Sequence, residues 1–279
     1  MSNWNPITPS IYHRLAFGSA YGLTDVGLVR KSNQDNFLID PAIGLVAVAD
    51  GMGGHEGGEI ASYTALQTMR EAIAESIRAQ AGGAAPALSD RQDPDATWQD
   101  QHMPAVMTVY EAVEHANAQV YVANVSNERG EGGGMGTTLT GFWHSQDGAP
   151  PIVFHVGDSR LYRLRGAELS VLTRDQTLYQ QALEDGAADN LPARNLLLQA
   201  IGPQATVAPD VKLCPCEPGD LLMLCSDGLY GNTPHAAIAA VMLRASAQSL
   251  DQCCFDLIEL AKQHGSRDNI TAVLALVER

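Results

Sequence analysis

The chain has 279 residues, a length that suits one large domain or two small ones. Its 17 basic and 32 acidic residues give a net charge of −15, which excludes the dense basic surface that duplex nucleic acid requires. No apolar run approaches the roughly 18 residues of a membrane-spanning helix, and residues 1–6 carry no secretory signal. The five cysteines, all in the last third of the chain, do not form a disulfide framework in number or spacing. We therefore expect a cytoplasmic protein without nucleic-acid or membrane partners.

Hydrophobic patterning predicts secondary structure along most of the chain. Short apolar or alternating runs have the length of strands, and longer stretches carry apolar residues every three or four positions, as helices do. Because the two types do not alternate regularly, their order predicts mixed α+β layers rather than a doubly wound parallel sheet. In chain order, we expect a strand at 45–49, helices over 59–80 and 104–128, strands at 152–156 and 161–165, a short helix over 177–184, a strand at 221–225, helices over 234–245 and 250–264, and a strand at 270–277.

Residues 81–103, between the first two predicted helices, are rich in Ala, Gly, Pro, Asp and Gln and lack periodicity. This composition is typical of a flexible, solvated connector. One helix–connector–helix unit cannot form a core by itself, so the connector does not divide two domains. We expect residues 1–279 to form a single domain.

Several signatures of phosphate chemistry are missing from the chain. No lysine follows a glycine, so there is no P-loop, and neither G-x-G-x-x-G nor G-x-S-x-G occurs. No cysteine has an arginine six residues later, which excludes the cysteine-dependent phosphatase loop. Asp93–Thr97 matches the D-x-D-x-T motif of haloacid-dehalogenase-type phosphatases, but it lies in the polar connector rather than at the end of a buried strand. We interpret that match as a coincidence.

Four aspartates lie where predicted strands begin or end. In antiparallel neighbours, the end of one strand and the start of the next share an edge, so these carboxylates can meet at one rim of the sheets. Asp-Gly and Asp-Asn pairs are common in turns, so a single strand-end aspartate of this kind is more often only part of a turn. The four residues are Asp50, Asp158, Asp227 and Asp268.

Two features favour a metal site over four unrelated turns. Asp50-Gly51 leads into the glycine-rich run 52–58 and then a helix, instead of a returning strand. Four acids without nearby lysines would also repel one another unless cations neutralised them. Oxygen ligands suit Mg²⁺ or Mn²⁺ better than zinc, and Gly51 can add its carbonyl oxygen to the Asp50 carboxylate.

Residues 25–36 place one of the few basic pairs, Arg30-Lys31, near a further acid, Asp35. The planar guanidinium of arginine fits a phosphate group bidentately. A lone arginine is more often an ordinary surface residue. The surrounding acids make Arg30 a candidate phosphate ligand.

Together these segments resemble the metal-dependent protein phosphatase family (type 2C, or PPM) in its bacterial form. Each motif is weak alone, but six in the family's order over nearly the whole chain are specific. They are Thr24–Arg30 with Asn33–Asp35, Asp50–His55, Gly136–Thr138, Val156–Arg160, Cys225–Leu229 and Ser266–Thr271.

The resemblance implies a four-layer α-β-β-α sandwich with two central, mainly antiparallel sheets and a metal site at one end. It implies that Asp50 bridges two Mn²⁺ or Mg²⁺ ions and that the Gly51 carbonyl binds the second ion. Asp227 and Asp268 would bind the first ion. Asp158 would hold a third, weaker ion together with Asp227.

Other roles implied by the resemblance concern the substrate. Arg30 would bind its phosphate, Asp35 would support the metal-bound water, and Asn269 would orient the neighbouring metal ligand. Residues 175–199 occupy the place of a mobile flap that influences substrate choice.

Two residues depart from the family pattern. Gln34 stands where many members have Glu, so one charge near the second ion is missing. Met52 stands where eukaryotic members have a histidine proposed as general acid. His55, three residues further on, is the nearest substitute as a proton donor.

The leading hypothesis is a protein serine/threonine phosphatase that hydrolyses phosphoserine and phosphothreonine with a metal-activated water. Its partners would be phosphorylated proteins, including a cognate protein kinase and its substrates, and it would act as a monomer. The alternative is a catalytically weak relative that binds phosphoproteins as a regulatory module. A third reading, with the same site chemistry, is a phosphatase for a small phosphorylated metabolite or a regulator of sigma-factor partners.

Overall fold

The structure is a computed structural model that describes residues 7–54, 57–81, 102–126, 134–145 and 149–278. Most of the predicted connector 81–103, namely residues 82–101, lies outside the described residues. All five cysteines carry free thiols, as their number and spacing predicted. Among the described residues, no helix is long and apolar enough to cross a membrane.

One antiparallel sheet of six strands has the order β1-β2-β12-β11-β8-β9. Its central strands β11 and β12 consist almost entirely of apolar residues because neighbouring layers cover both of their faces. The strands are β1 (His13–Leu15), β2 (Gly18–Asp25), β8 (Arg160–Arg165), β9 (Glu168–Val171), β11 (Leu221–Cys225) and β12 (Ile270–Val277).

The second sheet has the order β10-β7-β6-β4-β3, and a two-residue strand, β5, pairs with the end of β4. All its pairings are antiparallel. The strands are β3 (Asp35–Asp40), β4 (Leu45–Met52), β5 (Gly136–Thr137), β6 (Leu139–Trp143), β7 (Ile152–Val156) and β10 (Asp210–Leu213).

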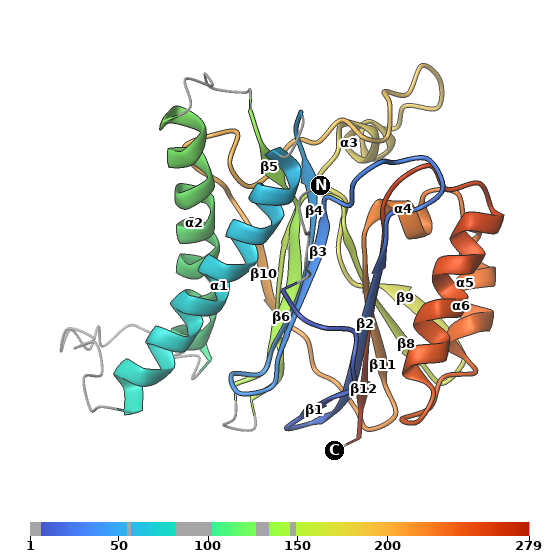
Figure 1. Ribbon diagram of the computed structural model, residues 1–279, viewed down its shortest axis with the longest axis horizontal. Coiled ribbons are helices and arrows are strands. Elements are labelled where there is room, and N and C mark those ends of the chain that lie inside the picture. Colours follow the sequence, from blue (N-terminus) through green and yellow to red (C-terminus); the bar gives the residue numbers. More distant parts are fainter. Residues whose placement is uncertain (1–6, 55–56, 82–101, 127–133, 146–148, 279) are drawn as a thin grey trace.

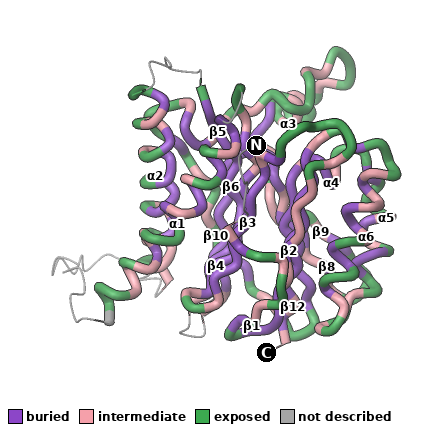
Figure 2. The backbone as a smooth tube through the Cα atoms, in the orientation of Figure 1, coloured by how far each residue is buried: buried purple, intermediate pink, exposed green. Residues whose placement is uncertain are grey.

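Helices cover the outer face of each sheet, so the molecule has four layers (Figure 1). The long helices α1 (Gly57–Ala81) and α2 (Met103–Ser126) pack on the second sheet. The first sheet is covered by α4 (Asp227–Tyr230), α5 (His235–Met242) and α6 (Leu250–Gln263). Burial is concentrated in the two sheets and on the helix faces turned toward them (Figure 2). The predicted α-β-β-α sandwich is confirmed.

A third hydrophobic core lies between the two sheets. It contains Phe37 and Val48 of the second sheet and Leu224 and Val273 of the first, all 1% exposed or less. Through this shared core the two sheets pack face to face, and their strand ends meet at a common edge. Burial of these side chains provides the main force that holds the edge in place.

The strand register brings the candidate acids to that edge, at the top of Figure 1. Asp35 at the start of β3 pairs with Asp50 near the end of β4. Cys225 at the end of β11 pairs with Ala272 near the start of β12, so Asp227 and Asp268 flank the same edge of the first sheet. The antiparallel arrangement therefore gathers acids that are far apart in sequence.

Residues 157–159 carry the chain from β7 in the second sheet to β8 in the first. Gly157 has a φ of +104°, and a Cβ there would lie 2.7 Å from the Thr138 side chain. The turn that leads into Asp158 therefore requires glycine for both its backbone conformation and its space.

We expect Gly157→Ala to lower the free energy of unfolding by about 2–6 kcal/mol, because backbone strain and overpacking add. Gly166→Ala is the matched control, since Gly166 has a φ of +59° but nothing within 4 Å of its added Cβ. That control should lose only about 1–2 kcal/mol. Chemical denaturation measures both, and equal losses would contradict this account of the turn.

Candidate active site

The backbone of Asp50 is fixed from the side of β5 and β6. Its amide donates to Thr138 Oγ1 at 2.9 Å. Its carbonyl accepts from the Thr138 amide and from the Thr137 hydroxyl, both at 2.9 Å. These bonds fix the point from which the Asp50 carboxylate projects.

Gly51 lies where three chain segments approach one another closely. A Cβ at this position would lie 2.1 Å from the Gly58 carbonyl oxygen and 2.6 Å from the Gln34 carbonyl oxygen. Only glycine fits there. No side chain can therefore occupy this position, and the backbone carbonyl is the group that Gly51 can offer to a ligand.

Asp35 links the two sheets at the base of the site and is 1% exposed. Its Oδ2 accepts hydrogen bonds from Ser226 Oγ, directly after β11, at 2.6 Å and from Thr271 Oγ1 of β12 at 2.7 Å. Its Oδ1 is buried without a hydrogen-bond partner in the described part of the chain. A buried carboxylate oxygen without a partner is costly, so it points to a water or cation as the missing partner.

Burial and mutual repulsion perturb the acids at this edge. Burial, followed by the charges of the neighbouring aspartates, raises the pKa of Asp50 well above its usual value. The same causes raise the pKa of Asp227 to about 6. Burial raises the pKa of Asp158 to about 7, with a further contribution from Asp227. Each carboxylate is thus an unfavourable neighbour for the others unless positive charge is added.

Arg30 supplies positive charge from the loop after β2. Its guanidinium donates to Asp268 Oδ2 at 2.6 Å, and about half of the side chain remains exposed, at 51%. This hydrogen bond raises the pKa of Arg30, and the charges of Asp50 and Asp227 act in the same direction. The arginine therefore lies over the acids with free donors turned to solvent.

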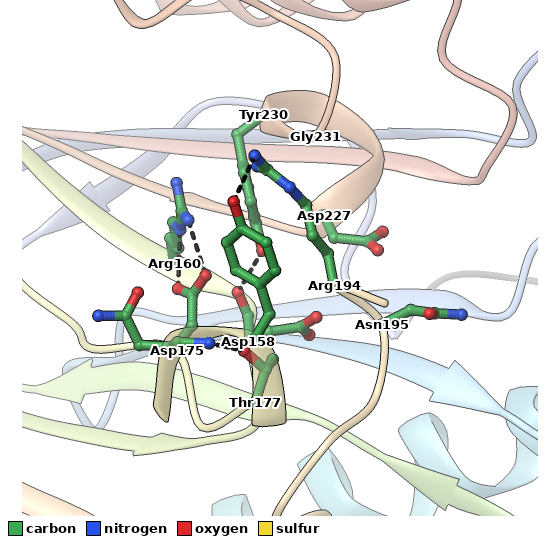
Figure 3. Close-up of a pocket in the computed structure, with 11 residues that line it drawn as sticks. Asp158, Arg160, Asp175, Thr177, Arg194, Asn195, Asp227, Tyr230 and Gly231 are labelled. Atoms are coloured by element: carbon green, nitrogen blue, oxygen red, sulfur yellow. Dashed lines mark hydrogen bonds and ion pairs between the residues drawn. The ribbon is translucent and has the colours of Figure 1, made fainter. Parts of the chain in front are cut away.

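Asp158 lies in the turn between the sheets and is 7% exposed. Its carbonyl accepts from the Tyr230 hydroxyl at 2.9 Å. The preceding Gly157 exchanges hydrogen bonds with Gln176, through the Gln176 side chain at 3.0 Å and the Gln176 amide at 2.8 Å. Asp158 and Asp227 line a common cavity with residues of the predicted flap (Figure 3).

The donor set fits hard divalent ions, although the side chains are not converged on one point. Within the described ranges, no three His, Cys, Asp or Glu side chains form a ready metal cluster. Asp268 is turned to Arg30, and Asp35 Oδ2 to two hydroxyls. The unpartnered Asp35 oxygen and the repulsion among the all-oxygen donors nevertheless match the needs of Mg²⁺ or Mn²⁺.

The structure places most of the predicted site residues along one edge. The charges of Asp35, Asp158, Asp227 and Asp268 all raise the pKa of Asp50. Arg30 contacts Asp268. The candidate proton donor His55 lies outside the described residues.

Sequence reasoning did not find the hydroxyl residues that hold the acids. Thr138 fixes the Asp50 backbone, whereas Ser226 and Thr271 bond the Asp35 carboxylate. The available signal was that Ser226 and Thr271 lie one and three residues from the strand-end acids Asp227 and Asp268, and that Thr138 belongs to the Gly136–Thr138 motif. Asn269 holds the nearby loop, because its side chain donates to the carbonyls of Val26 and Ser32 at 3.0 and 2.9 Å.

Comparisons with known proteins agree with this arrangement. Residues 29–275 match the protein phosphatase 2C family. The serine/threonine phosphatase stp of Listeria monocytogenes serotype 4b is 31% identical over 264 residues, covering 92% of this chain and 94% of that protein. The crystal structure of the Mycobacterium tuberculosis phosphatase PstP/Ppp is similar with a TM-score of 0.74 and 29% identity, covering 93% of this chain and 98% of that one. A structure of the PstP catalytic domain in complex with two manganese ions has a TM-score of 0.73 and 29% identity, with coverage of 93% and 98%.

The fold and the edge of acids define a metal-dependent phosphatase. The chain belongs to the protein phosphatase 2C family. It is therefore an enzyme that removes phosphate from proteins, as the strand-end motifs predicted. The alternative reading as a catalytically weak binding module is not favoured.

Charge repulsion at this edge predicts that Asp158→Asn stabilises the metal-free protein. Because the pKa of Asp158 in the fold, about 7, exceeds its ordinary value of 3.8, its ionisation costs stability increasingly as pH rises between these values. In the presence of chelator, the variant should gain about 1–3 kcal/mol at pH 8 and little near pH 4.

The control is Asp189→Asn, because Asp189 is exposed. It should change the free energy of unfolding by less than about 0.5 kcal/mol at either pH. Denaturant titrations at the two pH values measure the difference. An Asp158→Asn variant that is less stable than the parent at pH 8 would refute the repulsion argument.

Proposed function

We propose that this protein hydrolyses phosphoserine and phosphothreonine in proteins with a pair of bound Mn²⁺ or Mg²⁺ ions. The observation that carries the proposal is the gathering of Asp35, Asp50, Asp227 and Asp268 at one edge with Arg30 above them. The serine/threonine assignment of the stp and PstP phosphatases, and the two manganese ions of PstP, support it.

Asp50 would bridge the two ions and the Gly51 carbonyl would bind one of them, while Asp227 and Asp268 would hold the other. When bound, such ions neutralise phosphate charge and make water nucleophilic at neutral pH. The bonds from Thr137 and Thr138 to the Asp50 backbone keep that carboxylate in position for this role.

Arg30 would orient the substrate phosphate. In the structure its guanidinium pairs with Asp268, and binding of a cation by Asp268 would free the arginine for phosphate. Asp35, anchored by two hydroxyls, would use its free Oδ1 to hold a water. His55 would serve as proton donor to the leaving hydroxyl.

Several finer points belong to the same proposal. Asp158 would hold a third, weaker ion with Asp227, and residues 175–199 would act as a substrate-selecting flap. Residues 1–279 would form one domain that works as a monomer. The substrates would include a cognate protein kinase and its targets.

The purified protein should hydrolyse p-nitrophenyl phosphate and phosphothreonine peptides with Mn²⁺ and stop when chelator is added. Asp50→Asn and Asp227→Ala should each lower kcat/KM by more than about 100-fold, since even outer-shell changes cost about 10–100-fold. Glu71→Gln, at an exposed position of α1 outside the site, should keep full activity. Unchanged turnover in either ligand variant would contradict the assignment, and calorimetry that detects no Mn²⁺ binding would favour a binding module.

Arg30→Ala should lower kcat/KM for phosphopeptides by about 10–100-fold, because it removes a charged hydrogen bond worth about 1.5–3 kcal/mol. Arg30→Lys should recover only part of the loss, since an ammonium lacks the planar fork. Inhibition by free phosphate should weaken in parallel when measured with the same assay. If Arg30→Ala leaves both kcat/KM and phosphate inhibition unchanged, Arg30 does not bind the phosphate.

A further inference from the structure

A cavity of about 220 Å³ opens between the acidic edge and the segment 175–195. Asp158 and Asp227 line it from the sheet edge, and Asp175, Thr177, Arg194 and Asn195 line it from the opposite segment (Figure 3). The reacting phosphate at the candidate site would therefore lie next to this cavity. A group attached to the same substrate can reach into it.

Hydrogen bonds join the two ends of the segment to each other and join the segment to the catalytic edge. Leu178 N donates to the Leu196 carbonyl at 2.9 Å and Leu198 N donates to the Gln176 carbonyl at 2.8 Å. Gln176 in turn bonds Gly157, next to Asp158. These links hold Arg194 at a defined place relative to the acids.

Of the two arginines that line the cavity, Arg160 is fully engaged. It donates two hydrogen bonds to Asp175, at 2.8 and 2.7 Å, and its guanidinium lies 3.7 Å from the centre of the Tyr230 ring. The charges of Arg160 and Asp175 therefore cancel. Neither is available to a ligand without breaking this pair.

Arg194, unlike Arg160, has no carboxylate partner among the described residues. Its guanidinium donates to the Tyr179 hydroxyl at 3.1 Å and lies 4.5 Å from the centre of that ring. Most of its five N–H groups remain free to bind an anion. Stacking on tyrosine orients the planar fork and lowers the entropy that binding would cost.

The charge and size of the cavity suit one small anionic group. Once cations neutralise Asp158 and Asp227, Arg194 is the uncompensated charge in the lining. A volume of about 220 Å³ lies below the about 300–1,000 Å³ of pockets that enclose whole small molecules. It accommodates the head group of a side chain next to the reacting residue.

We propose that Arg194, stacked on Tyr179, binds a second anionic group of the substrate, a carboxylate or phosphate on a side chain near the phosphoester that is hydrolysed. This specificity role rests on the proposed protein phosphatase function and deepens it. The protein then favours phosphorylated segments that are rich in acidic or further phosphorylated residues, despite its own net charge of −15. Arg194 selects the substrate and takes no part in the chemical step.

The test compares kcat/KM, measured with Mn²⁺, among phosphothreonine peptides. The peptides differ only at the two positions that lie two residues before and two residues after the phosphothreonine. These positions carry alanine, glutamate or a non-hydrolysable phosphonate analogue of phosphothreonine. The wild type should favour the anionic peptides by about tenfold or more, as one charged hydrogen bond would give. If the phosphonate peptide is preferred over the glutamate peptide, phosphate is the natural group. If the two are hydrolysed equally well, carboxylates are the natural groups.

Arg194→Ala should bring the ratio of kcat/KM between the anionic and the alanine peptides close to one. Arg194→Lys should keep part of the wild-type preference. The ratio between peptides is unaffected by a change in the amount of folded enzyme. Arg244→Ala is the matched control, because that exposed arginine lies outside the cavity and pairs with Asp256. It should keep the wild-type preference.

The inference is overturned if the wild type treats the peptides alike or if Arg194→Ala keeps the preference. If no peptide is hydrolysed at all, the proposed function fails instead. Dissociation constants of the fluorescein-labelled peptides, measured by anisotropy, then still decide on Arg194. Equal constants for wild type and Arg194→Ala exclude its role.

Discussion

Mutual repulsion among carboxylates at the edge where two sheets meet is the constraint on which the site depends. The hydrophobic core between the sheets, which buries Phe37 of one sheet and Leu224 of the other, holds together the two sheets whose strand ends carry these acids. Hydroxyls from Ser226 and Thr271 relieve part of the cost at Asp35. Bound cations would relieve the remaining cost, so the strain that destabilises the metal-free fold would also favour metal binding.

Much of the fold could be predicted from local patterning. The long helices α1 and α2 agree with the predicted ranges within a few residues, because apolar side chains recur at helical spacing on the face that packs against the sheet. Strands β2 and β3 were not predicted. β2 consists largely of small and polar residues, and Gly22 is required because the Phe37 ring from the other sheet lies where its Cβ would be, 2.4 Å away. Such a strand is stabilised by its neighbours rather than by its own pattern.

Asp50, Asp158, Asp227 and Asp268 could be predicted because each lies at the end of a strand with a recognisable apolar run, and antiparallel order makes those ends meet. The hydroxyl residues that hold these acids could not be predicted. The sequence around Thr138 does not show whether its hydroxyl bonds a neighbouring strand or water. The pairing of Arg30 with Asp268 likewise depends on residues 238 positions apart. The segment that carries Arg194 belongs to neither sheet, yet it joins the catalytic edge through Gln176. The residue that we propose for substrate selection thus lies outside the layers that carry the candidate metal ligands.

The most direct measurement of the central claim is anomalous diffraction at the manganese edge from crystals grown with Mn²⁺. We expect two adjacent peaks at the strand-end edge, with Asp50 in contact with both and with Asp227 and Asp268 as ligands of one of them. Peaks located away from Asp50, or an edge without bound manganese at saturating concentration, would contradict it.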